Sequence, residues 1–161
     1  MGCMISAISY ASDINSKMYL SPWSFDCSVA QSTGNKVCVF ERSMFEDESR
    51  KVKIASIVFS MTNAKGSPQL SQTIVSPLGT LLTPGVTILI GDKATTLPFI
   101  FCDQRGCFSQ TIVDNKNFER LTKSKEVKLQ YKLPTSQDAQ IIFSLNGFQE
   151  AFESTKKQLS H

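Results

Sequence analysis

Two cysteines separated by a short connection join two strand-like apolar runs, and this arrangement constrains the fold more than any other feature of the sequence. Cys102 ends the first run and Cys107 begins the second, with Asp103 and Gly106 between them. Aspartate and glycine are typical of tight turns, so the connection predicts a β-hairpin loop that a disulfide closes. A structural disulfide in turn indicates an oxidising compartment.

Four of the five cysteines form two such neighbouring pairs, and the fifth, Cys3, belongs to the start of the chain. Opposed hairpin positions hold Cα atoms near the separation that a disulfide needs, which favours the pairings Cys27–Cys38 and Cys102–Cys107. Two alternatives remain at this point. A four-cysteine zinc site usually has ligand pairs about two to four residues apart, and a redox dithiol usually shows Cys-x-x-Cys.

Length and charge limit the classes of protein to consider. A chain of 161 residues suits one domain with its own hydrophobic core. Seventeen Lys and Arg against fourteen Asp and Glu give a net charge of +3, and the basic residues are scattered. A nucleic-acid partner is therefore not expected, because such proteins concentrate basic charge on one face. No apolar run reaches the roughly 18 residues of a membrane-spanning helix, so no transmembrane span is expected.

The first twenty residues differ in character from the rest. They begin small and apolar and turn polar after Ser9-Tyr10-Ala11, which is typical of the end of a secretory signal peptide. We therefore expect residues 1–20 to be a signal-peptide remnant with an N-terminal extension, and residues 21–161 to be a single β-sandwich domain. Myristoylation at Gly2 and lipid attachment at Cys3 are alternatives for this end of the chain.

Alternation of apolar and polar residues predicts an all-β fold. From Val127 to Leu133 every second residue is apolar, which indicates a strand with one buried face. Shifted alternation within 51–62 predicts a bulge near Ala55 and Ser56. The other expected strands lie around Val37 and Val39 and at 70–76, 86–90, 97–102 and 107–113. Their close spacing favours an antiparallel sandwich over βαβ units.

Two short helices are expected within this β fold. Asp114 and Asn115 predict the cap of a connector helix that runs to Thr122. A second helix should follow Gly147, because an apolar stripe begins at Phe148. The residues predicted to form the core between the sheets are Trp23, Phe25, Val39, Ile57, Phe59, Phe99, Phe101, Leu129, Tyr131, Phe143 and Leu145.

The sequence offers no set of residues for common enzyme chemistry. Its single histidine is the last residue, His161, which leaves no Ser-His-Asp or Cys-His site. Ser144 lacks the Gly-x-Ser-x-Gly elbow and alternates as a polar strand position. No phosphate loop, dinucleotide fingerprint or calcium loop occurs. We therefore expect no catalytic residue, no metal and no cofactor, and a binding or structural role.

Short motifs spread along the chain, from Trp23 to about Leu159, resemble the bacterial invasion-associated locus B family. The motifs are Trp23-Ser24-Phe25-Asp26-Cys27, Cys38-Val39, Pro77-Leu78-Gly79, Pro84-Gly85-Val86 with Ile90-Gly91-Asp92, Pro98-Phe99 with Cys102 and Gly106-Cys107, and Phe143-Ser144-Leu145-Asn146-Gly147-Phe148 with Ala151. The resemblance implies an immunoglobulin-like β-sandwich, export through the inner membrane, and a role in bacterial entry into host cells, particularly erythrocytes. It implies no catalytic residues.

These observations predict a non-enzymatic, exported virulence protein that acts in host-cell invasion by binding another protein, on the host-cell surface or in the bacterial envelope. Its expected location is the periplasm, the outer membrane or the medium. A periplasmic envelope-assembly or housekeeping factor with an indirect effect on invasion is the alternative. The candidate interaction loop is Asp103, Gln104, Arg105 and Gly106, because a rigid exposed loop loses little entropy on binding. A purely structural turn is the competing interpretation of this loop.

Overall fold

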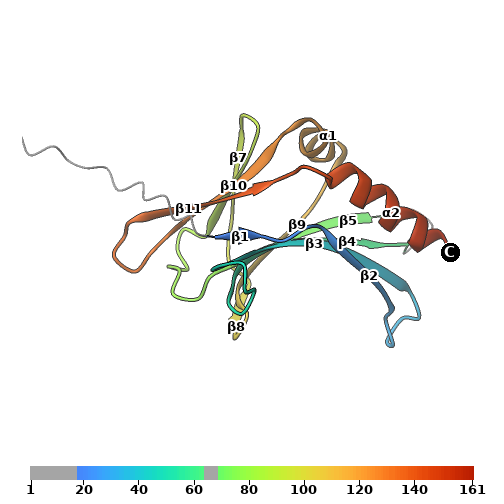
Figure 1. Cartoon of the computed structure of the whole chain (residues 1–161), viewed down its shortest axis with the longest axis horizontal. Helices are drawn as coiled ribbons and strands as arrows, with labels where there is room; N and C mark the ends of the chain where they lie inside the picture. Colours follow the sequence, from blue (N-terminus) through green and yellow to red (C-terminus); the bar gives the residue numbers. More distant parts are fainter. Residues whose placement is uncertain (1–17, 64–68) are drawn as a thin grey trace, which may run out of the picture.

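Two antiparallel β-sheets pack face to face in the computed structural model, which describes residues 18–63 and 69–161 (Figure 1). Sheet A has the strand order β1-β3-β4-β5-β9-β8, and β2 pairs with the same strand, β3, that β1 pairs with. Its strands are β1 (Tyr19–Leu20), β2 (Ser24–Val29), β3 (Lys36–Phe45), β4 (Lys53–Thr62), β5 (Gln69–Ser76), β8 (Phe101–Asp103) and β9 (Gly106–Ile112). The sequence predictions for Gly2, Cys3 and the end of the signal peptide near Ser9-Tyr10-Ala11 fall outside the described residues.

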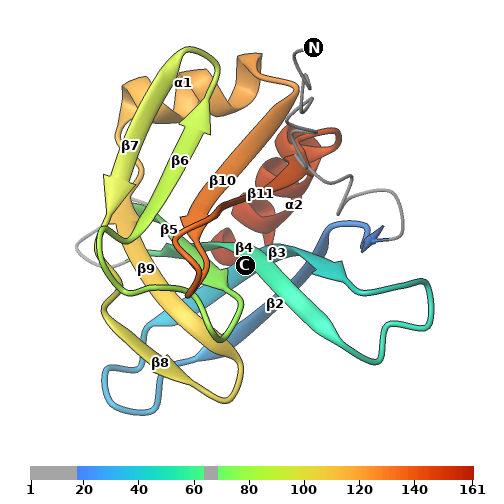
Figure 2. The ribbon, with the colours of Figure 1, turned by 90° about the vertical axis from the view of Figure 1, so that its left-hand side faces the viewer.

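Sheet B has the order β11-β10-β6-β7, and two helices accompany the sandwich. Its elements are β6 (Val86–Ile90), β7 (Lys93–Leu97), β10 (Glu126–Lys132) and β11 (Asp138–Ser144), and the helices are α1 (Asn115–Lys123) and α2 (Phe148–Ser160). Figure 2 shows β6, β7 and β10 side by side, with α1 across one end of their layer. This arrangement confirms the predicted all-β, immunoglobulin-like sandwich with a connector helix and a C-terminal helix.

The two helices begin where local sequence signals place them. The Asp114 carboxylate accepts the backbone N–H of Asn117 and caps α1. Gly147 precedes α2 with a φ of +83°, a conformation that favours glycine. Buried Phe148, Thr155 and Leu159 then dock α2 against the inner side of sheet A, where it contacts β2, β3 and β4.

Alternation along the strands places the core between the sheets. Val127, Leu129 and Tyr131 of β10 lie opposite residues of β11 on the buried face. The predicted core residues Ile57, Phe59, Leu129, Tyr131, Phe143 and Leu145 are buried, while Trp23 and Phe99 are partly buried against the core. The predicted bulge is also present, because Met44 pairs with Ala55 whereas Phe45 pairs with Lys53.

Three predicted core residues are not buried in the core. Val39 lies on the outer face, because Cys38 and Phe40 are the inward residues of β3. Phe101 is 50% exposed, because its ring stacks on the outer face of sheet A. Phe25 lies opposite the inward Phe40 but is 54% exposed, because β2 is at the edge of sheet A.

The strand predicted at 97–102 is wrong as a single element. The chain instead leaves sheet B at the end of β7 and enters sheet A at the start of β8. Pro98 lies between the two strands, and proline lacks the N–H that a continuous ladder would need. The predicted run thus covers the last residue of β7, the crossing between the sheets and the first two residues of β8.

Candidate interaction surface

Each disulfide joins directly opposed residues of a strand pair. Cys27 faces Cys38 between β2 and β3, and Cys102 faces Cys107 between β8 and β9. The Cα atoms of each pair are 4.0 Å apart, and both predicted bridges are present. Since these sulfur atoms are bonded to one another, no thiolate is left for the four-cysteine zinc site. Within residues 18–63 and 69–161, no other group of His, Cys, Asp and Glu could hold a metal.

The β8–β9 turn brings the four predicted loop residues together at the surface, and its two charges satisfy each other. The Arg105 guanidinium donates to the Asp103 carboxylate, with Nη2 and Oδ2 2.6 Å apart. The backbone N–H of Arg105 also donates to Asp103 Oδ1 at 2.8 Å. These hydrogen bonds lower the pKa of the Asp103 carboxyl and raise the pKa of Arg105. The loop is therefore ordered by its own ion pair.

Gly106 holds this turn close to β5 and tolerates no side chain. Its φ is +141°, and a Cβ atom at this position would lie 2.2 Å from the carbonyl oxygen of Ser76. The turn is thus fixed against the sheet, with Gly106 buried and the Arg105 side chain 70% exposed. The interaction role of Asp103, Gln104, Arg105 and Gly106 stays a prediction.

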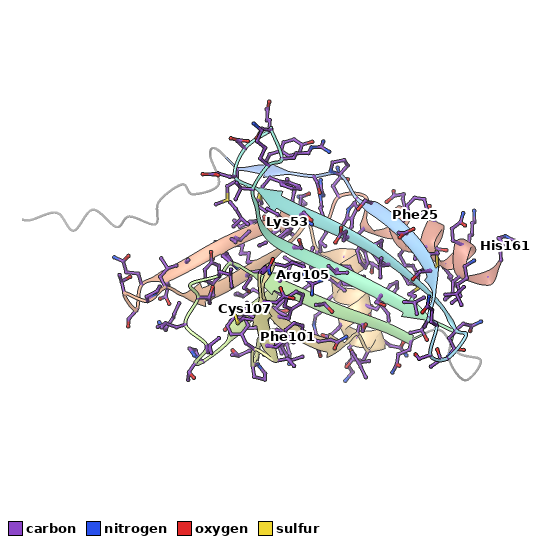
Figure 3. All side chains as sticks on the ribbon, turned by 90° about the horizontal axis from the view of Figure 1, so that it is seen from below. Phe25, Lys53, Phe101, Arg105, Cys107 and His161 are labelled. Atoms are coloured by element: carbon purple, nitrogen blue, oxygen red, sulfur yellow. A yellow bond between two sulfur atoms is a disulfide. The ribbon has the colours of Figure 1, made fainter. Side chains whose placement is uncertain are left out.

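The Arg105 side chain folds back over the outer face of sheet A. Its guanidinium carbon lies 4.8 Å from the centre of the Phe108 ring, a cation–π geometry. The Phe101 ring stacks on the same Phe108 with a centroid distance of 4.5 Å. Figure 3 looks onto this face and shows Arg105 and Lys53 over the strands, with Phe101 beside them.

A groove of about 400 Å³ runs across this outer face, and we call it the sheet A groove. Its floor consists of the apolar side chains Val39, Val58, Val75 and Phe108. The other lining residues are Glu41, Lys53, Ser56, Ser60, Thr73, Arg105 and Gln110. Among the described residues, no helix or second sheet lies over this face (Figures 1 and 3). The groove adjoins the predicted loop through Arg105.

The outer face of sheet B differs sharply from this surface. It carries the ion pairs Lys132–Asp138 at 2.7 Å and Lys128–Glu126 at 3.4 Å. Gln130 also donates to Gln140 across the same two strands. Such a charged face is an ordinary solvated exterior. The sheet A groove differs from such an exterior, because valines and small hydroxyl residues occupy the equivalent outward positions.

Among the described residues, three charged ones line the groove: Glu41, Lys53 and Arg105. Arg105 is paired with Asp103, whereas Glu41 and Lys53 form no ion pair with any described residue. The groove could not be predicted from the sequence, because its lining comes from β3, β4, β5 and β9, and the pairing of β5 with β9 is not set by local sequence. One feature of the sequence could nevertheless have indicated this groove: the outward residues of β4, Ser56, Val58 and Ser60, are all uncharged.

A larger depression, of about 560 Å³, lies between the α1–β10 connection and the start of α2. Its lining includes Ser144, whose hydroxyl accepts the backbone N–H of Asn146 at 3.2 Å. This local hydrogen bond agrees with a structural role for Ser144. None of the predicted loop residues lines this depression.

Comparison with known proteins gives three findings. The model of the invasion associated locus B (IalB) protein family matches residues 23–156. The crystal structure of invasion associated protein B from Bartonella henselae superposes with a TM-score of 0.73 and 19% identity, covering 88% of this chain and 97% of that chain. No curated protein matches the sequence significantly. Separately, neither described helix is long and apolar enough to cross a membrane.

Proposed function

The chain belongs to the invasion associated locus B family, and from this premise we propose that it is an exported, non-enzymatic bacterial protein acting in host-cell entry, in particular entry into erythrocytes. The two disulfides support export, since such bonds persist in oxidising compartments. The proposed working unit is the single domain 21–161. Its compartment is the periplasm, the outer membrane or the medium.

Protein binding is the mode of action that we propose, with the sheet A groove as the contact surface. The uncharged floor of this groove, on a sheet face that no described helix or second sheet covers, is the observation that carries the proposal. Two valines of this floor, Val39 and Val58, are partly exposed, and exposed apolar surface is typical of interaction sites. Arg105 adds a pre-ordered cation at the border, because its ion pair with Asp103 and its contact with Phe108 hold the side chain in place.

The experiment compares lysine substitutions on the two outer faces. A deletion strain is complemented with the native gene, with Val58→Lys in the groove floor, or with Leu89→Lys on the outer side of sheet B. Both residues are partly exposed valine or leucine positions on strands, so the fold should tolerate each lysine. We expect Val58→Lys to reduce erythrocyte entry to the level of the deletion strain and Leu89→Lys to retain native entry.

Localisation separates this proposal from its alternative. Protease treatment of intact bacteria should degrade the protein if it acts on the outer surface, while release into the medium would support direct action equally. Strict confinement to the periplasm would favour the envelope-assembly role. Equal entry by the deletion and native strains would contradict a role in invasion altogether.

A further inference from the structure

Strand β2 forms an edge of sheet A, because among the described residues it pairs only with β3 and no strand pairs with its other side. Cys27 and Cys38 face each other with Cα atoms 4.0 Å apart, the short spacing of a non-hydrogen-bonded antiparallel pair. The N–H and C=O of Cys27 therefore point away from β3. The Ala30 N–H donates to the Asn35 carbonyl, so even-numbered residues bond to β3. By alternation, Phe25 and Val29 also direct their backbone groups outward.

This edge carries little of the usual protection against pairing, because Asp26 is its single charged residue. Proteins commonly guard edge strands with lysine, proline, a bulge or a covering element. Strand β2 contains neither lysine nor proline, and it carries two large exposed apolar side chains, Phe25 at 54% and Val29 at 62%. The Cys27–Cys38 bridge also fixes the strand in register with β3, so little order would be lost on pairing.

We propose that β2 pairs antiparallel with β2 of a second copy of this chain, about a two-fold axis at Cys27. In this register Cys27 faces the second copy's Cys27, and Phe25 faces the second copy's Val29. The three residues with outward backbone groups then all lie in hydrogen-bonded pairs. An aromatic residue opposite a β-branched residue is a favourable cross-strand pair, and the two-fold axis repeats it.

Charge selects this register over its neighbours. With the axis at Cys27, the single charged residue of the strand, Asp26, faces the second copy's Ser28. An axis at Asp26 would place two carboxylates opposite each other, which destabilises a strand pair. An axis at Ser28 would leave Phe25 opposite no residue of β2. The edge is therefore complementary to itself in one register.

The dimer would extend sheet A across both copies. Because the axis is perpendicular to the sheet at Cys27, the two sheet A grooves would open on the same side. A partner anchored on a surface would then be held at two points, which raises the effective affinity without new contacts. The pairing itself stands on β2 alone and does not require the proposed function.

The test measures molar mass by light scattering and sedimentation over a range of protein concentrations. We expect the native protein to reach twice the 17.8 kDa of one chain. Phe25→Lys and Val29→Glu should each raise the dissociation constant by about tenfold or more, because each places a charge opposite an apolar residue at both ends of the ladder. An equimolar mixture of the two variants should dimerise again, since the introduced lysine of one chain would face the introduced glutamate of the other.

Ile112→Lys is the matched control, because Ile112 is 60% exposed on β9, away from β2. It should leave the dimer unchanged, and circular dichroism should show that all variants remain folded. Amide hydrogen exchange at Phe25, Cys27 and Val29 should slow in the native dimer. A native protein that is monomeric up to about 1 mM, the weak end of measured affinities, would overturn the proposal. So would dimers that survive both charged substitutions.

Discussion

Trp23 and Arg42 donate hydrogen bonds to one carbonyl oxygen, that of Asn146. The indole Nε1 lies 2.8 Å from this oxygen and Arg42 Nη1 lies 3.2 Å from it. The same guanidinium donates to the carbonyls of Ser144 and Ser21, each at 2.7 Å. One side chain of β3 therefore ties the turn before α2 to the chain before β2, and it links the two sheets.

Loss of this guanidinium should destabilise the fold. Arg42→Ala removes three hydrogen bonds that Nε and Nη1 of one charged group donate to backbone carbonyls, and hydrogen bonds to charged groups contribute about 1.5–3 kcal/mol each. We expect the free energy of unfolding to fall by about 2–4 kcal/mol, since water replaces some of these bonds. Urea denaturation followed by the fluorescence of Trp23, the only tryptophan, measures the change.

Lys51→Ala is the control for this measurement. Because Lys51 is exposed, this substitution should leave the free energy of unfolding nearly unchanged. The stability of Arg42→Lys should fall between those of the two alanine variants. A lysine ammonium keeps the charge but lacks the planar fork of donors with which arginine reaches three separated carbonyls. Equal stability of Arg42→Ala and Lys51→Ala would contradict the structural role of Arg42.

The role of Arg42 could not be predicted from the sequence. Its acceptors come from Ser21, Ser144 and Asn146, which are far from Arg42 in the chain. Alternation was informative where a strand has one clearly polar face, as in β10, and misleading in β3. There Val37 and Val39 look like the buried series, whereas the disulfide residue Cys38 and Phe40 are the ones that face inward.

Gly106→Ala should cost much more stability than Gly34→Ala. Both glycines have positive φ, +141° and +71°, but a Cβ atom at Gly34 would have no heavy atom within 4 Å. At Gly106 the added atom would lie 2.2 Å from a backbone oxygen that cannot move away cheaply. We expect a loss of about 1 kcal/mol for Gly34→Ala and about 3 kcal/mol or more for Gly106→Ala. Similar thermal midpoints for both variants would contradict the close approach.

The ion pair within the loop should be visible in a carboxyl titration. Hydrogen bonds from Arg105 lower the pKa of Asp103, so its folded-state value lies below that of the unfolded chain. The resulting stabilisation is present above the unfolded pKa and is lost as pH falls through the lower folded value. Arg105→Ala should raise the pKa of Asp103 while leaving it somewhat depressed, because the backbone N–H at 105 still donates. Carbon NMR of the Asp103 carboxyl tests this, and an unchanged midpoint would contradict it.

Features set by local chemistry were predictable, whereas those assembled from distant strands were not. The caps at Asp114 and Gly147 and the two hairpin disulfides depend on residues close together in sequence. The sheet A groove depends on strand order, which alternation does not specify. The burial of Phe25 and Phe101 was mispredicted for the same reason, because only the topology places their strands at edges.

Two phenylalanines that were both predicted to lie in the core differ in burial, and their alanine variants should differ in stability. Phe143 is fully buried and Phe25 is 54% exposed. Phe143→Ala should lower the free energy of unfolding by about 3–5 kcal/mol through lost burial and the cavity left behind. Phe25→Ala should stay within about 0.5–1 kcal/mol of native in dilute protein, where any association is minor. A near-neutral Phe143→Ala would mean that the inner face of β11 is misplaced.

The two disulfides should be reduced in a fixed order. Cys102 is exposed, so a small thiolate can attack its sulfur, whereas Cys38 is completely buried and Cys27 is half-buried beside it. Under mild dithiothreitol, alkylation and mass spectrometry should therefore find modified Cys102 and Cys107 before Cys27 and Cys38. A disulfide that closes a longer loop stabilises more in the chain-entropy model. Replacing Cys27 and Cys38 by alanine should therefore lower the free energy of unfolding by about 2–3 kcal/mol, and replacing Cys102 and Cys107, which close a shorter loop, by about 2 kcal/mol. Labelling of Cys27 first would show that the β2 edge opens more readily than the β8–β9 turn.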